Sequence, residues 1–135
     1  MIYLIAYVAT AIVFLGLDFI WLSQIAIGFY KSRIGALLMD EPNLGVSAIF
    51  YLFYVAGLVY LAVVPALNSG SWTTALVAGA VFGLVAYGTY DITNLATLKG
   101  WSVSVSVVDM IWGMCLSSVA ATSGYFIASS LVRGV

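Results

Sequence analysis

Residues 46–66 read VSAIFYLFYVAGLVYLAVVPA, a run that contains no charged side chain and has Pro65 next to its end. A helix that crosses a bilayer needs about 20 mostly apolar residues, and this run has that length. The rest of the chain is similar, because 64% of its 135 residues are hydrophobic and only 7% are charged. Soluble domains carry roughly 25% charged residues. The composition therefore predicts an integral membrane protein, and the lipid bilayer is its expected partner.

Three further apolar runs are long enough to cross a membrane, and each is interrupted by a single aspartate, namely Asp18, Asp91 or Asp109. We therefore expect an all-α fold, an integral membrane bundle of four transmembrane helices in one domain that covers residues 1–135. The expected spans are residues 2–23, 46–66, 74–95 and 103–131. The last run exceeds the minimum length, so that helix is expected to tilt or to project from the bilayer.

The first connection, residues 24–45, leaves two alternatives open. Apolar residues alternate there with Lys31 and Arg33 at near-helical spacing, so part of this loop could be an interfacial segment in the plane of the membrane surface. Alternatively, the first helix simply continues to about Leu38. The sequence favours neither reading over the other.

Charge and residue types exclude several classes of function. The chain has four Lys and Arg residues, five Asp and Glu residues and no His. Four scattered cations cannot form the basic face that nucleic-acid binding requires. The lack of His removes most zinc, haem and di-iron sites, so we expect no metal site, and the sequence assigns no cofactor. The single cysteine, Cys115, allows no internal disulfide.

The distribution of Lys and Arg predicts an orientation in the cell (inner) membrane. Lys31, Arg33 and Lys99 fall in loops on one side of the bundle, and Arg133 falls on the other side. Cytoplasmic loops are enriched in Lys and Arg. Loops 24–45 and 96–102 are therefore expected in the cytoplasm and both termini outside.

The three intramembrane aspartates are expected at one depth. Asp18 and Asp91 lie about one turn before their helices end, and Asp109 lies about two turns after its helix begins. The first and third helices run towards the cytoplasm and the fourth runs away from it, so all three carboxyl groups fall in the cytoplasmic half of the bilayer. An Asp at the centre of a membrane helix costs about 2.5–3.5 kcal/mol. By topology, Arg33 and Lys99 are the nearest cations that could neutralise such a cluster.

Helical spacing adds a second convergence. Gly79, Gly83, Tyr87, Asp91 and Asn94 fall on one face of the third helix, with Tyr90 beside them. Gly79 and Gly83 allow close approach of another backbone, and they are also the expected contact of a homo-oligomer.

The first and fourth helices carry similar strings in opposite directions through the bilayer. Residues 18–21 read DFIW and residues 109–112 read DMIW, which places Trp21 and Trp112 on the same faces as their aspartates and hints at an inverted pair. The candidate ligand-binding residues are Asp18, Trp21, Tyr87, Tyr90, Asp91, Asn94, Asp109 and Trp112. The alternative is that each Asp lies near the interface and is simply hydrated or bonded to a Trp indole.

These pieces together resemble a family of bacterial membrane proteins grouped as domain of unknown function 2177. The most specific part is Tyr90-Asp91-Ile92-Thr93-Asn94, and the resemblance covers essentially the whole chain. The other matching pieces are residues 17–22, Phe29-Tyr30, Pro42-Asn43, Phe50-Tyr51, Pro65-Ala66, residues 87–97, Trp101 and residues 108–113. The resemblance implies a four-helix bacterial membrane protein and no particular chemistry.

Three functional hypotheses remain open. The aspartates, asparagine and aromatic side chains could bind or translocate a proton or a small polar or cationic ligand. They could instead belong to a small membrane enzyme that acts on a lipid or isoprenoid with clustered carboxylates. Finally, the chain could be an accessory subunit of a membrane complex. The first hypothesis is preferred, because carboxylates flanked by aromatic faces suit organic cations; whether the chain is an enzyme stays open.

Overall fold

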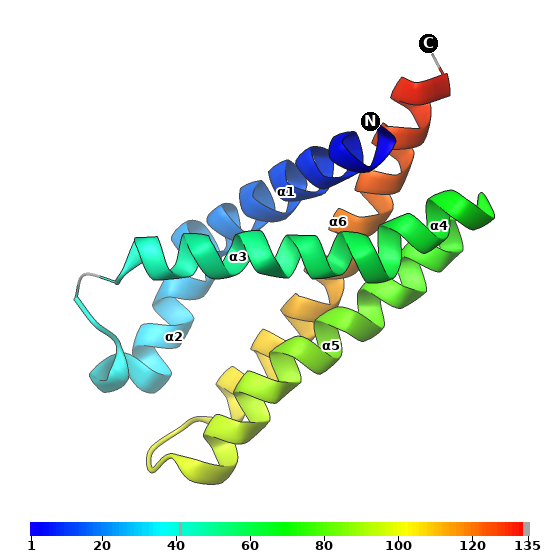
Figure 1. Ribbon diagram of the computed structural model, residues 1–135. Coiled ribbons are helices and arrows are strands. Elements are labelled where there is room, and N and C mark those ends of the chain that lie inside the picture. The colour runs from blue at the N-terminus through cyan, green and yellow to red at the C-terminus, as the bar shows by residue number, and fades with distance from the viewer. Residues whose placement is uncertain (41, 134–135) are drawn as a thin grey trace.

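The computed structural model describes residues 1–40 and 42–133, and this part of the chain is helical and contains no strand. Figure 1 shows the elements in order. They are α1 (Ile2–Ile20), the π-helical turn η1 (Trp21–Ala26), α2 (Ile27–Ile34), the short 3-10 helix η2 (Gly35–Leu37), α3 (Leu44–Leu58), the π-helical turn η3 (Val59–Val63), α4 (Val64–Ser69), α5 (Trp72–Thr97) and α6 (Val103–Arg133).

The expected all-α membrane fold is confirmed. Four continuous helical segments are long and apolar enough to cross a bilayer, namely Ile2–Leu37, Leu44–Ser69, Trp72–Thr97 and Val103–Val132. Each contains the corresponding span expected from the sequence and extends beyond it at one or both ends.

The first segment continues through η1 and α2, as in the second of the two alternatives for residues 24–45. It contains 36 residues, which corresponds to about 54 Å at 1.5 Å per residue. A hydrocarbon core is only about 30 Å thick. The segment is therefore longer than the core is thick, and its end, which carries Lys31 and Arg33, can extend beyond the core.

The second helix does not end at Pro65, although proline usually interrupts a helix. Pro65 is in the first turn of α4, directly after the π-helical turn η3. Proline lacks an N–H, and its ring collides with the carbonyl group four residues earlier in a regular α-helix. The wider π turn relieves both problems, so the helix continues to Ser69. Gly70, in the left-handed conformation at φ 71°, then ends it.

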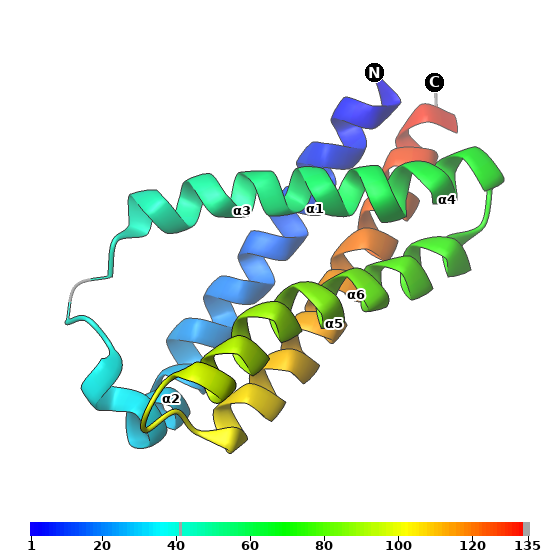
Figure 2. The ribbon, with the colours of Figure 1, turned by 60° about the horizontal axis from the view of Figure 1, so that its bottom comes forward.

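The start of α1 and the end of α6 lie at the same end of the bundle, and the end of α2, the start of α3 and the connection 98–102 lie at the opposite end (Figures 1 and 2). Helices α5 and α6 pack antiparallel along their length, and α1 packs against α6. Helix α3 diverges from α5 towards the loop end in both views. The bundle is therefore closed near the termini and more open near the loops.

The core lies where α3 and η3 meet α1, α5 and α6. Phe14, Val55, Leu58 and Leu116 are almost completely buried there. Large apolar side chains such as Phe19 and Phe53 remain more than 70% exposed on the outer faces. A packed interior together with an apolar outer surface is what a helical bundle in a bilayer requires.

The closest packing is along the α5–α6 seam, defined here by Gly79 and Gly83 of α5 and by Gly113, Ser117 and Ala121 of α6. A Cβ atom at Gly79 would lie 2.9 Å from the Ser117 carbonyl oxygen, and one at Gly83 would collide with the Gly113 carbonyl oxygen. The expected close approach is therefore present within the chain. Helix α6 covers both glycines, so this close contact is made within the chain, and a homo-oligomer through Gly79 and Gly83 stays a prediction.

Candidate functional site

Asp18 is held between α1 and α6 near the loop end of the bundle. It is only 5% exposed, and the Trp112 indole N–H donates a hydrogen bond to its Oδ1 over 3.2 Å. The ring of Trp112 also stacks on Trp21, with centroids 4.5 Å apart and planes inclined by 9°. The two Asp–Trp strings of the sequence thus meet each other across the bundle.

Asp109 receives its hydrogen bond from a residue that the sequence-derived set of candidates omits. The hydroxyl group of Tyr30 in α2 donates to Asp109 Oδ1 over 2.8 Å. In a regular α-helix, Tyr30 would lie about 120° around the axis from Asp18, at 100° per residue. The π turn η1 accommodates an extra residue, which reduces this angle to about 20°. Both residues therefore point into the bundle.

Asp91 is completely buried in α5. Among the residues that the structure describes, neither oxygen of its carboxyl group has a hydrogen-bond partner. Its backbone carbonyl oxygen accepts a bond from Ser106 Oγ at 2.9 Å, and Ser106 Oγ accepts one from the Trp101 indole, also at 2.9 Å. These hydrogen bonds hold the loop-side ends of α5 and α6 next to each other. They use the backbone carbonyl group of Asp91 and not its carboxyl group.

The three carboxyl groups lie in one region of the bundle. Asp109 lies between the two α6 residues that contact the other acids. Ser106, three residues before it, donates to the Asp91 carbonyl oxygen, and Trp112, three residues after it, donates to the Asp18 carboxyl group. The guanidinium group of Arg33 lies over the Phe29 ring, 5.3 Å from the centroid, and its contribution to neutralising the cluster stays a prediction. Lys99 is exposed in the loop.

We call the group formed by these side chains the acid–aromatic site; it comprises Asp18, Trp21, Tyr30, Asp91, Asp109 and Trp112. The site contains three acids and no cationic side chain, so its charged groups are all acidic. Acids that are buried without a cation are costly, and ionisable residues within membrane helices are by default functional candidates.

The other three candidates surround this site at different depths. The ring of Tyr87 packs directly over Gly113, where a Cβ atom would collide with it. Tyr90 is 57% exposed and meets Trp101 edge to face, with centroids 5.8 Å apart. Asn94 is half-buried, one turn nearer the loop. Tyr87 thus belongs to the interior, whereas Tyr90 and Asn94 lie towards the rim.

A groove of about 480 Å³ reaches the acid–aromatic site from the side of the bundle, and Asp109 lies in its wall. We call it the lateral groove; it is lined by Val46, Ser47, Phe50, Tyr51, Tyr54, Ala86, Tyr87, Tyr90 and Asp109. It lies where α3 diverges from α5. The hydroxyl groups of Tyr54 and Ser117 are hydrogen-bonded at 2.6 Å, which fixes Tyr54 at the inner end.

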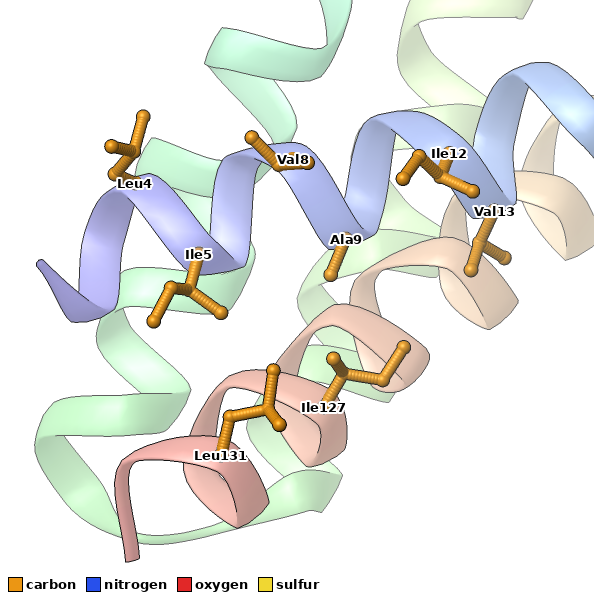
Figure 3. Close-up of a pocket in the computed structure, with 8 residues that line it drawn as sticks. All are labelled: Leu4, Ile5, Val8, Ala9, Ile12, Val13, Ile127 and Leu131. Carbon is orange, nitrogen blue, oxygen red and sulfur yellow. The ribbon is translucent and has the colours of Figure 1, made fainter. Parts of the chain in front are cut away.

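A second pocket, of about 460 Å³, lies at the opposite end of the bundle between α1 and α6 (Figure 3). Its eight lining residues are all apolar, and they include Leu4, Val8, Ile127 and Leu131. This surface suits contact with lipid chains and provides no group that would orient a polar ligand.

Metal binding has no support from the geometry. In the part of the chain that the structure describes, no three His, Cys, Asp or Glu residues are grouped so that they could hold a metal ion. Three aspartates in one region are therefore not, by themselves, a coordination sphere.

Comparisons with known proteins give one match. Neither the curated proteins nor the solved structures contain a protein that matches the chain. Residues 3–126 match the family described as "Predicted membrane protein (DUF2177)". This match extends into the fourth membrane helix and includes every residue of the acid–aromatic site, and the chain therefore belongs to the DUF2177 family of membrane proteins.

Proposed function

We propose that this multi-pass membrane protein binds a small organic cation at the acid–aromatic site, with Asp109 as the main charge partner. The observation that carries the proposal is the position of Asp109 between the contacts of α6 with Asp91 and with Asp18, which are both buried. The cations at this end of the bundle are exposed, namely Lys31, Arg33 and Lys99. A cation bound there would supply the compensating charge that the chain does not provide.

Electrostatics favours a ligand with a positive charge. Two charges attract each other more strongly inside a protein than in water, because the effective dielectric constant is lower. Asp109 is only partly buried and already accepts one hydrogen bond, from Tyr30. A carboxylate has further acceptor positions, so Asp109 can bind a cation without losing Tyr30.

The aromatic side chains favour an organic cation over a metal ion. Aromatic faces attract ammonium groups by about 0.5–1 kcal/mol at exposed sites and about 2 kcal/mol or more where water is excluded. Tyr54, Tyr87 and Tyr90 line the groove that leads to Asp109, and the stacked pair of Trp21 and Trp112 closes the site next to Asp18. Alkylated amines are the cations that benefit most from such surroundings.

A proton is the second candidate, and one observation favours it. Both carboxyl oxygens of Asp91 lack a donor in the described part of the chain, and Asp109 is its charged neighbour. A proton on either acid would create a donor and allow a hydrogen bond between the two groups. Exchange of that proton for an organic cation would couple the two candidate ligands.

The orientation expected from Lys and Arg is part of the proposal. With loops 24–45 and 96–102 in the cytoplasm and both termini outside, the site would lie in the cytoplasmic half of the inner membrane. The ligand would then reach it from the cytoplasm or from the inner leaflet.

The test is binding of tetraethylammonium to the purified chain in nanodiscs, followed by tryptophan fluorescence and calorimetry. We expect saturable binding that Asp109→Asn weakens at least tenfold, which corresponds to about 1.4 kcal/mol. Asp40→Asn is the matched control, because Asp40 is exposed in the first loop, outside the site. Equal affinity for the two variants, or no saturable binding by the unmodified chain, would refute the proposal.

A further inference from the structure

The lateral groove has a graded chemistry. Val46 and Phe50, at its outer edge, are 63% and 61% exposed and belong to the half of α3 that diverges from α5. The phenol rings of Tyr54 and Tyr87 lie further in, and the Asp109 carboxyl group lies in the wall. The groove therefore changes from hydrocarbon to phenol to carboxylate over its lining.

The position of the groove in the bundle makes its outer edge a membrane-facing surface. Val46 lies near the start of α3, and Tyr90 and Asp109 lie about two turns from the ends of their helices at the loop side. Helix α5 has 26 residues, or about 39 Å at 1.5 Å per residue, so a residue two turns from its end falls near the edge of a hydrocarbon core about 30 Å thick. Exposed apolar side chains at this depth contact lipid and not water.

We propose that the ligand of the acid–aromatic site is an amphiphilic cation from the membrane, with one ammonium headgroup and one hydrocarbon tail. Its headgroup binds at Asp109, and its tail leaves the protein sideways over Phe50 and Val46. This inference rests on the proposed function and adds the class of ligand and its route. A volume of about 480 Å³ is within the range of about 300–1,000 Å³ that is typical of small-molecule sites.

Charge complementarity also indicates that the headgroup of the ligand contains no phosphate. The groove lining includes an acid and four tyrosines but neither Lys nor Arg. A phosphate needs Arg, Lys or converging N–H groups, and near Asp109 it would be repelled. The tail also makes the affinity depend on apolar contact, because each buried CH₂ contributes about 0.8 kcal/mol.

The experiment compares two probes with the same tail and the same trimethylammonium group. Dodecyltrimethylammonium carries a net positive charge, whereas dodecylphosphocholine has a phosphate in addition. Both are titrated into phosphatidylcholine nanodiscs that contain the full chain, and empty nanodiscs give the blank for partitioning. We expect saturable binding of the first probe and at least tenfold weaker binding of the second. Equal affinities would overturn the inference, because they would mean that net charge does not select the headgroup.

Two exposed positions on α3 test the lateral route. Val46→Trp fills the groove, and Ile49→Trp, on the same helix but outside the groove lining, is the matched control. We expect Val46→Trp to weaken dodecyltrimethylammonium at least tenfold and Ile49→Trp to change it less than twofold. Tetraethylammonium, which has no tail, should lose less affinity in Val46→Trp than the amphiphile does and should bind Ile49→Trp within threefold of the unmodified chain.

The outcomes separate this inference from the proposed function. If Val46→Trp binds the amphiphile as well as Ile49→Trp does, the lateral route is wrong, whereas loss of tetraethylammonium binding in Asp109→Asn would still support the cation site. If Asp109→Asn binds both cations as tightly as the unmodified chain, the proposed function fails and the inference fails with it.

Discussion

The substitution Gly83→Ala tests whether backbone contact between α5 and α6 builds the framework of the site. A Cβ atom at this position would collide with the Gly113 carbonyl oxygen and would lie 2.7 Å from Ser117 Oγ and 2.8 Å from Ser117 Cβ. The Gly113 carbonyl group is part of a helix backbone and cannot rotate away. The two helices must therefore separate.

The expected cost follows from these contacts. Excess volume in a packed interior costs typically about 1–3 kcal/mol. Separation would also weaken the bond from Ser118 Oγ to the Leu76 carbonyl oxygen, which is worth about 0.5–1.5 kcal/mol. Alanine is the better helix former by up to about 1 kcal/mol, which offsets part of this loss. We expect a net destabilisation of about 2–3 kcal/mol.

The assay is equilibrium unfolding of the purified chain by sodium dodecyl sulfate in mixed micelles, followed by circular dichroism. Gly16→Ala is the matched control, because a Cβ atom at Gly16 meets nothing within 4 Å; its unfolding free energy should be unchanged or slightly higher. A Gly83→Ala variant as stable as Gly16→Ala would refute the close packing of α5 on α6.

Three further predictions concern the side chains of the site. Trp112→Phe removes the donor to Asp18 and should lower the unfolding free energy by about 1–3 kcal/mol; Trp72→Phe, near the other end of the bundle, should cost less in the same unfolding assay, and equal losses would contradict the role of the Asp18 bond. Tyr30→Phe removes the bond to Asp109 and should increase hydrogen exchange of the amides in α2, whereas Tyr60→Phe, at a 73% exposed position, should leave that exchange unchanged. If Asp91 holds a proton, infrared spectra at neutral pH should contain a protonated carboxyl band that is lost in Asp91→Asn and kept in Asp40→Asn; a spectrum of the unmodified chain without this band would remove the proton from the candidate ligands.

The sequence predicts the membrane helices well because hydropathy over about 20 residues measures the same quantity that the bilayer selects. The end of the bundle at which the three acids lie could also be predicted, because it depends only on the number of spans and the positions of Asp18, Asp91 and Asp109 along them. In the contact between Gly83 and Gly113, the sequence predicts the part played by Gly83 but does not identify Gly113 as its partner. Spacing indicates that Gly83 belongs to a packing face, but it does not say which helix covers it.

The positions that sequence reasoning missed follow from irregular helix geometry. The π turns η1 and η3 have no reliable sequence signal, yet η1 brings Tyr30 to Asp109 and η3 carries the helix past Pro65. The nearby Phe29-Tyr30 pair was visible in the sequence, but regular helical spacing turns Tyr30 away from Asp18. The bonds of Ser106 to Trp101 and to the Asp91 carbonyl oxygen depend on how the loop folds back, which helical spacing does not predict.

The glycine-rich contact between α5 and α6 has a consequence for which acids the chain tolerates. Because the main chains of α5 and α6 are in contact, the packing of the helices fixes the distance between the Cα atoms of residues 91 and 109. A substitution at either position can therefore change only the length and chemistry of the side chain. Asp91 already has no exposed surface, so an extra methylene group has no free volume. Glutamate, although it keeps the charge, should therefore be as poorly accepted at position 91 as a change of charge, and aspartate there is a requirement of size as much as of acidity.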